Sequence, residues 1–507
     1  MKVQNQNDKN VTMFESVELG QVISKQEFKG QEPEIRAQLL ALQRELRDAN
    51  IATLIIVAGV EAAGKGDVVN RLNKWFDSRG VQTHAFWDET DEEKERPDTW
   101  RFWRRMPARG SIGIMFGGWY WDPLRERANG RIDDVDLDEV SRAIGEHERM
   151  LSLDGMLIIK LWFHLSKDAH VRRMKKRHEL QKHIKGLPTE GAGVETYDEY
   201  LIAAERCIRL TDSGECPWHL VESDDKWFRD LSVARVLTSM MHQRMEEHRV
   251  SDRRMQVHEP TIPVDNHPLT ILDHVDLTAS LPREEYKKLL KRYKARLHEL
   301  AWQAYAAKKS TMIVFEGWDA AGKGGTIRRM TSAIDARLFR SISVAAPTDE
   351  ERAHHYLWRF WRRVPRAGYM TIYDRSWYGR VLVERVEGFA EHYEWMRAYR
   401  EINTFEEQLV NHGIVLIKFW LHISPEEQLR RFKEREELSW KQYKITDEDW
   451  RNREKWNEYK QAVKTMVEHT STGLAPWTLI PANDKLIARI EVLKTVCERL
   501  SELLETK

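Results

Sequence analysis

The sequence contains one glycine-rich motif twice, each time between a short apolar run and an amphipathic helical pattern. The second occurrence covers residues 317–325 and reads GWDAAGKGG. The apolar run 312–315 before it is typical of a buried strand, and apolar residues at helical spacing follow from Ile327 to Leu338. A strand, a glycine loop with a lysine, and a helix in this order predict a phosphate-binding loop.

The residues of this motif indicate how it would bind phosphate. Glycines let successive backbone N–H groups converge on phosphate oxygens, and the helix N-terminus adds partial positive charge. Lys323 supplies a point charge for the outer phosphates. Gly324 stands where such loops usually carry a magnesium-binding Ser or Thr, and Asp319 adds a carboxylate. The other loop residues expected around the phosphates are Gly317, Ala320, Ala321, Gly322, Gly325 and Thr326.

The first occurrence of the motif begins at Gly59, 258 residues before Gly317 (317 − 59), and this offset persists. FWRR at 102–105 recurs at 360–363, and after one inserted residue PW at 217–218 recurs at 476–477. Because the period far exceeds that of solenoid repeats, it indicates two copies of one domain. The predicted divisions are a polar tail (1–30), a first domain (31–250), a linker (251–268) and a second domain (269–507).

Within each copy, strand-like apolar runs alternate with helical patterns. This alternation predicts an α/β fold in which helices cover both faces of a parallel sheet. Ligands of such sheets bind at the carboxyl ends of strands, where the glycine loop is expected.

Composition narrows the class of protein. Lys plus Arg and Asp plus Glu both number 81, so no bulk charge indicates nucleic acid or a membrane as partner. The three cysteines lack a metal-binding spacing, and no apolar run has the length of a membrane span. We therefore expect a soluble cytoplasmic protein whose anion sites are local clusters of cations.

Residues 370–380, MTIYDRSWYGR, form a second motif in which a strand-like run ends at Asp374. In phosphate-loop enzymes an acidic residue at a strand end holds magnesium. Asp374 could instead cap a helix, but the glycine loop and its lysine favour the metal role. Arg375 and Arg380 would lie near that metal and could bind phosphoryl oxygens bidentately.

Two further segments are rich in cations. The charged helical segment that begins at Leu429 is either a lid that closes over phosphates or a solvated helix. Five arginines also fall within 15 positions, with no acidic residue after the first, and form either a solvated face or a track for an anion. These five are Arg352, Arg359, Arg362, Arg363 and Arg366.

The DAAGKGG loop, the DRSWYGR run and the basic segment together resemble the second family of polyphosphate kinases. The tandem duplication resembles the two-domain subgroup of that family, the polyphosphate:AMP phosphotransferases. The resemblance covers all but about the first 30 residues. It implies a phosphate-loop kinase fold with a helical lid, assembly into a homo-oligomer, and Mg²⁺-dependent transfer of the terminal phosphoryl group of polyphosphate to AMP, giving ADP.

The resemblance also implies residue roles. Lys323 would bind phosphate, and Asp319 and Asp374 would hold magnesium and the acceptor phosphate. Arg375 and Arg380 would stabilise the transferring group. The arginines from 352 to 366 are the candidate track, because polyphosphate is charged along its whole length. The candidate lid residues are Arg430, Arg431, Lys433, Arg435, Lys441 and Lys444.

The first copy lacks several of these groups. Phe116 stands at the position equivalent to Asp374, although Lys65 is retained. A lone lysine cannot replace a lost metal site, so we expect the first copy not to catalyse. The other replacements are Gly117 for Arg375, Gly118 for Ser376, Asp122 for Arg380, Glu61 for Asp319 and Asp67 for Gly325.

Two other interpretations remain open from the sequence. An ATP-dependent nucleoside monophosphate kinase would share this fold, but Gly324 in place of Ser or Thr argues against it. A non-catalytic polyphosphate-binding scaffold is the second alternative. The set of Lys323, Asp319 and Asp374 in the second copy argues against a scaffold.

Overall fold

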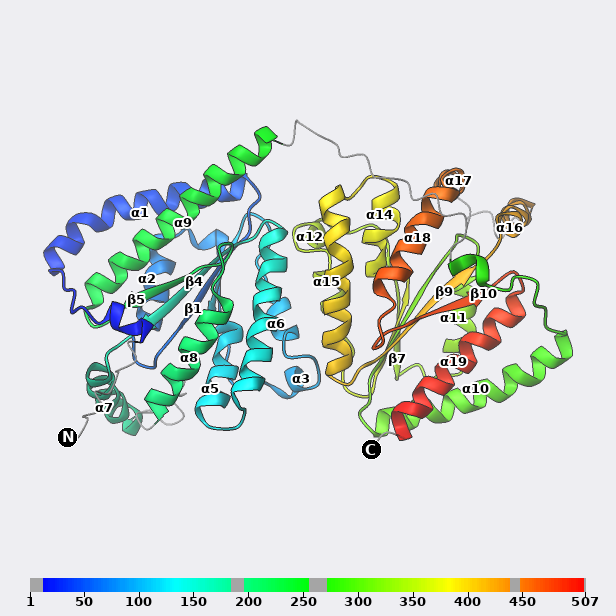
Figure 1. Cartoon of the computed structure of the whole chain (residues 1–507), viewed down its shortest axis with the longest axis horizontal. Helices are drawn as coiled ribbons and strands as arrows, with labels where there is room; N and C mark the ends of the chain where they lie inside the picture. Colours follow the sequence, from blue (N-terminus) through cyan, green and yellow to red (C-terminus); the bar gives the residue numbers. More distant parts are fainter. Residues whose placement is uncertain (1–11, 184–195, 255–270, 438–446, 506–507) are drawn as a thin grey trace, which may run out of the picture. The chain divides into compact units, whose positions relative to one another are not determined.

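The computed structural model describes residues 12–183, 196–254, 271–437 and 447–505. The chain divides into two compact units. The first consists of residues 1–89, 101–261 and 353–355, and the second of residues 90–100, 262–352 and 356–507. Each unit contains one five-stranded parallel sheet flanked by helices, which confirms the predicted α/β fold in tandem (Figure 1).

The two sheets have the same topology. The first has the order β2-β3-β1-β4-β5 and the second the order β7-β8-β6-β9-β10, so equivalent strands occupy equivalent places. All pairings are parallel among the described residues. The strands are β1 (Thr53–Gly59), β2 (Val81–Ala85), β3 (Ile112–Phe116), β4 (Leu157–His164), β5 (Trp218–Glu222), β6 (Thr311–Gly317), β7 (Phe339–Ser343), β8 (Met370–Asp374), β9 (Val415–His422) and β10 (Trp477–Pro481).

Helices connect the strands on both faces of each sheet (Figure 1). Those of the first half of the chain are α1 (Lys25–Asp48), α2 (Lys65–Trp75), α3 (Asp91–Lys94), α4 (Trp100–Trp103), α5 (Trp121–Ala128), α6 (Asp134–Leu153), α7 (Lys167–His183), α8 (Tyr197–Thr211) and α9 (Lys226–Arg254). Those of the second half are α10 (Arg283–Ala306), α11 (Lys323–Thr331), α12 (Asp349–Arg352), α13 (Trp358–Trp361), α14 (Val383–Val386), α15 (His392–Asn411), α16 (Pro425–Glu437), α17 (Asp447–Glu454), α18 (Trp456–Thr470) and α19 (Lys485–Glu505). None of the helices that the structure describes combines the length and the apolar composition that a membrane crossing requires.

The expectation of a polar tail over residues 1–30 is wrong for the part that the structure describes. Phe14 is buried and stacks on Trp162 and His164 of β4, with ring centroids 5.7 and 4.9 Å apart. Phe28 is also buried, and it belongs to α1, which begins at Lys25 within the expected tail. No periodic pattern of apolar residues indicated this, since tertiary contacts rather than a local pattern hold these aromatic side chains.

A buried charged cluster stabilises the second domain beside the glycine loop. The ammonium of Lys418 on β9 lies 2.7 Å from a carboxylate oxygen of Glu406 on α15, and both side chains are almost fully buried. Trp377 and Tyr378 donate hydrogen bonds to the same carboxylate, at 3.0 and 2.5 Å. Since both residues belong to the turn after β8, the cluster fixes that turn. The first domain repeats the arrangement with Lys160, Glu148, Trp119 and Tyr120.

Lys418→Met should lower the free energy of unfolding of the second domain by roughly 3–5 kcal/mol, because it leaves the carboxylate of Glu406 buried without its cation. The double variant Lys418→Met/Glu406→Gln should recover part of this loss. Urea unfolding followed by tryptophan fluorescence measures both effects. The control Lys287→Met removes an exposed ion pair with Glu284 and should change stability by less than about 1 kcal/mol. Equal stability of Lys418→Met and the control would contradict the prediction.

Candidate functional site

The glycine loop connects the carboxyl end of β6 to α11, at the edge of the sheet where ligands of parallel sheets bind. A Cβ atom at Gly317 would lie 2.5 Å from the carbonyl oxygen of Leu421 on β9, so no larger residue fits. Ala320 has a φ of 61°, a left-handed conformation that is uncommon for a non-glycine residue. Such strain persists where the surrounding structure imposes it, and it is frequent at ligand sites.

The Arg431 guanidinium on α16 imposes the conformation of the loop. It donates to the carbonyl oxygens of Ala320 and Ala321, both at 2.9 Å, and to that of Ala482 at 2.6 Å. Its side chain is only 2% exposed and also pairs with Glu427 at 2.6 Å. Arg431 therefore holds the loop from behind, which differs from the phosphate-facing lid role expected for it. Because its partners are backbone oxygens far away in the sequence, no motif could have indicated this contact.

Lys323 is the first residue of α11, and its side chain folds back over the loop. Its ammonium donates to the carbonyl oxygens of Gly317 and Trp318, at 2.5 and 3.4 Å. The side chain stays partly exposed and borders the cavity in front of the loop. The cation is thus held where a phosphate bound by the loop would meet it.

Asp319 lies inside the loop and is a carboxylate at neutral pH. Burial alone would raise the pKa of Asp319, but the charges of Lys323 and Arg375 lower it below its usual value. Arg375 donates to one carboxylate oxygen at 3.2 Å, and Asn452 on α17 donates to the other at 2.9 Å. The hydroxyl of Tyr459 in turn donates to Asn452 at 3.2 Å. Sequence reasoning missed Asn452 and Tyr459, which lie more than 130 positions from the loop.

Asp374 is the last residue of β8, the strand beside β6, and pairs in register with Phe315. A Cβ atom at Gly324 would lie 3.6 Å from its carboxylate, so Asp374 faces the first turn of α11. The next residue, Arg375, has a φ of 63°, and its backbone N–H donates to Phe315 at 3.0 Å.

Four of the five groups expected to carry the chemistry border one cavity of about 570 Å³. Asp319, Lys323, Asp374 and Arg375 line it together with the loop, and Arg435 of α16 lies at its border. A smaller pocket of about 70 Å³ adjoins it and shares Asp319, Lys323 and Arg375. Its other walls are mostly aromatic and aliphatic, formed by Trp318, Trp420, Leu382, Val383 and Tyr459.

Glu316 is a second residue that the sequence analysis missed. It lines the smaller pocket, is only 5% exposed, and accepts a hydrogen bond of 2.8 Å from the Ser376 hydroxyl. Burial raises the pKa of Glu316, although Lys323 opposes the shift. A comparison of the two copies could have indicated Glu316. The first copy has Ala58 at the equivalent position and also lacks the equivalent of Ser376, so both hydrogen-bond partners are absent there.

Other sequence candidates lie elsewhere. Arg380 lines neither cavity: its guanidinium lies 3.1 Å from Glu384 and 3.7 Å from Glu394. The acids that precede the arginine-rich stretch neutralise part of it. Arg352 pairs with Asp349, Arg359 with Glu351 at 3.4 Å, and Arg362 with Glu350 at 3.2 Å. Of the remaining candidates, Arg363, Arg366 and Lys433 are exposed, Arg430 pairs with Glu427, and Lys441 and Lys444 lie outside the described residues.

The first copy retains the loop, but its surroundings differ. A pocket of about 10 Å³ lies beside Lys65, where the second copy has the smaller pocket of about 70 Å³, and Phe116 and Trp121 are among the residues that line it. The Lys65 ammonium donates to Gly59 and Val60 at 2.7 and 3.0 Å and lies 5.8 Å from the Phe116 ring centroid. Aromatic side chains therefore lie beside Lys65, where the second copy has the carboxylate of Asp374 near Lys323.

A magnesium ion at this site would rest on few protein ligands. The described part of the chain contains no group of three or more acidic, histidine or cysteine side chains that could hold a metal. Mg²⁺ in phosphoryl-transfer sites is commonly bound by one or two carboxylates together with substrate phosphates and water. The carboxylates of Asp319 and Asp374, on one cavity beside a phosphate loop, fit that requirement.

Comparison with known proteins decides the family. The model of the polyphosphate kinase 2 family matches residues 22–249 and 280–506. The chain belongs to the polyphosphate kinase 2 family. A polyphosphate:AMP phosphotransferase of Pseudomonas aeruginosa is 46% identical over 96% of this chain and 98% of its own length. One from Acinetobacter johnsonii is 37% identical over 91% of this chain and 93% of its own. A crystal structure of a polyphosphate kinase 2 from Pseudomonas aeruginosa has a TM-score of 0.87 at 44% identity, covering 98% of this chain and all of that one.

Arg431→Met should destabilise the second domain by at least roughly 3 kcal/mol, because it removes several charge-assisted hydrogen bonds to buried carbonyl oxygens. Thermal unfolding and the rate of proteolysis within the loop measure the effect. The adjacent Arg430→Met is the matched control: Arg430 is exposed and pairs with Glu427 and Glu434 of its own helix, so its loss should lower the free energy of unfolding by less than about 1 kcal/mol. Similar losses in both variants would show that Arg431 does not hold the loop.

Proposed function

We propose that this chain transfers the terminal phosphoryl group of inorganic polyphosphate to AMP, giving ADP, in its second domain. The observation that carries the proposal is one cavity bordered by a glycine loop, Lys323 and the carboxylates of Asp319 and Asp374. The names of relatives that align over almost the whole chain support polyphosphate as donor and AMP as acceptor.

The catalytic residues in this proposal act through position and charge. A phosphoryl group passes between two anions that repel each other, so the protein mainly aligns them and neutralises their charge. The N–H groups of the loop and the ammonium of Lys323 would bind the donor phosphates. Arg375 would stabilise the transferring group, and Asn452 and Arg375 would hold Asp319 in place. Arg380 would act only indirectly, since acids of α14 and α15 bind it.

Asp319 and Asp374 would hold Mg²⁺ together with oxygens of the substrates. When bound, the ion neutralises charge that develops on the phosphoryl oxygens. The lowered pKa of Asp319 keeps this carboxylate ionised at neutral pH and so available as a ligand. Its present partners, Arg375 and Asn452, would keep its orientation before the ion arrives.

The first domain, residues 31–250, would not catalyse in this proposal, and residues 269–507 would form the catalytic domain. The support is the loss of the carboxylate at Phe116 and the aromatic lining of the pocket beside Lys65, which includes Phe116 and Trp121. Arg435, at the cavity border, is the described lid residue best located to meet the donor. We also propose that this chain assembles into a homo-oligomer.

A matrix of phosphoryl donors and acceptors tests the function directly. Purified protein with Mg²⁺ should form ADP from AMP and polyphosphate, and a chelator such as EDTA should abolish the product. Chromatographic quantification of ADP is the measurement. Formation of ADP only when ATP replaces polyphosphate would instead favour an ordinary nucleoside monophosphate kinase. Tight polyphosphate binding without turnover of any donor would favour a scaffold.

The division of labour between the domains gives a second test. Lys323→Ala and Asp374→Ala should each reduce kcat by a factor of at least 100, because removing one electrostatic partner of the transition state costs roughly 3–4 kcal/mol. The matched variant Lys65→Ala changes the equivalent lysine of the first domain and should retain most activity. Equal losses from Lys323→Ala and Lys65→Ala would overturn the assignment of catalysis to the second domain.

A further inference from the structure

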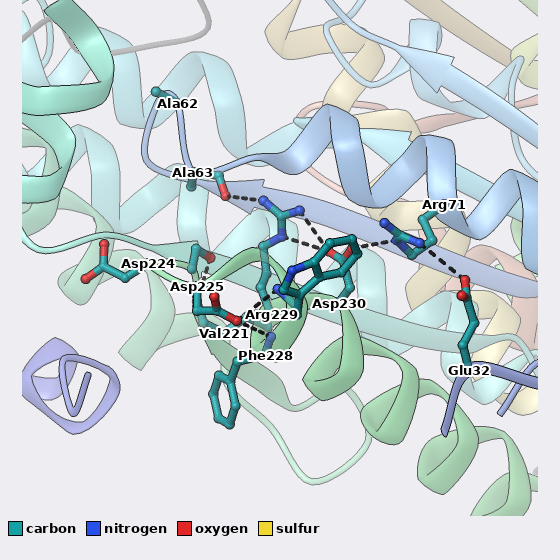
Figure 2. Close-up of polar contacts among 12 residues, drawn as sticks. Glu32, Ala62, Ala63, Arg71, Val221, Asp224, Asp225, Phe228, Arg229 and Asp230 are labelled. Carbon is teal, nitrogen blue, oxygen red and sulfur yellow. Dashed lines mark hydrogen bonds and ion pairs between the residues drawn. The ribbon is translucent and has the colours of Figure 1, made fainter. Parts of the chain in front are cut away.

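Behind the loop of the first domain, a carboxylate lies between two arginines (Figure 2). Asp230 on α9 accepts hydrogen bonds from Arg229 at 2.8 and 2.9 Å and from Arg71 on α2 at 2.5 Å. Arg71 also pairs with Glu32 of α1 at 3.2 Å. Every cation of this group therefore has an acidic partner within the domain, and no external anion is needed to balance it.

The second domain keeps one of these cations and loses both acids. Arg329 is equivalent to Arg71, at the offset of 258 (329 − 71). Glu32 is replaced by Leu290 at the same offset, and Asp230 is replaced by Arg489 at the offset of 259 that follows the inserted residue. Where the first domain has an arginine between two carboxylates, the second domain thus has two arginines and a leucine.

The two arginines of the second domain both approach Gly325. A Cβ atom at Gly325 would lie 3.9 Å from Nη1 of Arg329 and 3.8 Å from Nη2 of Arg489. Burial lowers the pKa of Arg489, and the charge of Arg329 lowers it further. The hydrogen bond with Tyr286 and the charge of Asp484 oppose this lowering of the pKa. Arg329 donates to the carbonyl oxygen of Gly325 at 2.9 Å.

Neither guanidinium has a carboxylate within ion-pair distance among the residues that the structure describes. Two like charges held side by side and partly buried repel each other, and an anion between them would reverse that energy. Guanidinium groups bind phosphate oxygens bidentately, which makes a phosphate the best-matched anion.

We propose that Arg329 and Arg489 bind an internal phosphate of the polyphosphate donor, several units from the phosphoryl group that is transferred. This proposal rests on the proposed function. Gly325 connects the two places. It lines the cavity of about 570 Å³, its carbonyl oxygen accepts from Arg329, and a Cβ atom added to it would lie 3.8 Å from Nη2 of Arg489. AMP carries one phosphate, which must lie at the reacting carboxylates, so only a chain donor needs a second phosphate site. The donor chain therefore runs along α11 towards α19. It does not contact Arg359 and Arg362, which are paired with Glu351 and Glu350.

Chain length is the variable that tests this site. Arg329→Gln and Arg489→Gln should each raise KM for long-chain polyphosphate at least tenfold, while KM for tripolyphosphate and KM for AMP change less than twofold. The control Arg337→Gln, which removes an exposed side chain paired with Asp335, should leave all three constants unchanged. Arg489→Lys keeps the charge and should restore part of the affinity for long chains.

Arg489→Asp imitates the first domain and gives the sharpest outcome. The new carboxylate should pair with Arg329, leave the melting temperature unchanged or raised, and abolish the preference for long chains over tripolyphosphate. A KM for long chains that stays within twofold of the wild-type value in both glutamine variants would overturn the proposal. An equal rise in KM for long-chain polyphosphate and in KM for tripolyphosphate would also overturn it. Failure of the wild-type protein to use polyphosphate at all would instead refute the proposed function. The same assay measures this turnover before the variants are compared.

Discussion

The glycine loop depends on donors for its outward-facing carbonyl oxygens. When backbone N–H groups of a loop turn inward towards a phosphate, the carbonyl groups of the same peptides turn outward and need partners of their own. Arg431 supplies them in the second domain, with bonds of 2.9 Å to Ala320 and Ala321. In the first domain Arg173 donates to Ala62 at 3.1 Å, and Arg229 donates to Ala63 at 3.2 Å. These contacts between an arginine and the loop carbonyl oxygens, which we call the brace, thus occur in both domains.

The brace explains how one fold can serve two purposes. Arg431 and Arg173 are equivalent, and the buried cluster of Lys418 and Glu406 recurs as Lys160 and Glu148. These groups maintain the backbone and are present in both copies. The groups that differ face the space in front of the loop or lie beside its helix. Because few contacts of the framework involve those positions, carboxylates, cations and aromatic rings can replace one another there without changing the fold.

Charge is what separates the two domains. In the second, Asp319, Lys323, Asp374 and Arg375 surround a cavity of about 570 Å³, and the charges of Lys323 and Arg375 lower the pKa of Asp319 and keep its carboxylate ionised. In the first, Phe116 occupies the place of Asp374, and Phe116 and Trp121 line the pocket beside Lys65. A cavity of charged groups requires solvent or ligand to occupy it, whereas aromatic rings fill the same space by packing on one another.

The sequence by itself determined the duplication, the parallel α/β fold and the loop, because glycine spacing, apolar runs and a fixed offset are local signals. It also gave the four residues that meet at the cavity. Tertiary structure alone decided which cations face that cavity. Arg431 lies behind the loop, and Arg380 lies beside Glu384 and Glu394, although the sequence around these arginines did not indicate their partners. A side chain's partner depends on which distant backbone or carboxylate the fold brings within about 3 Å, and a pattern along the chain does not contain that distance.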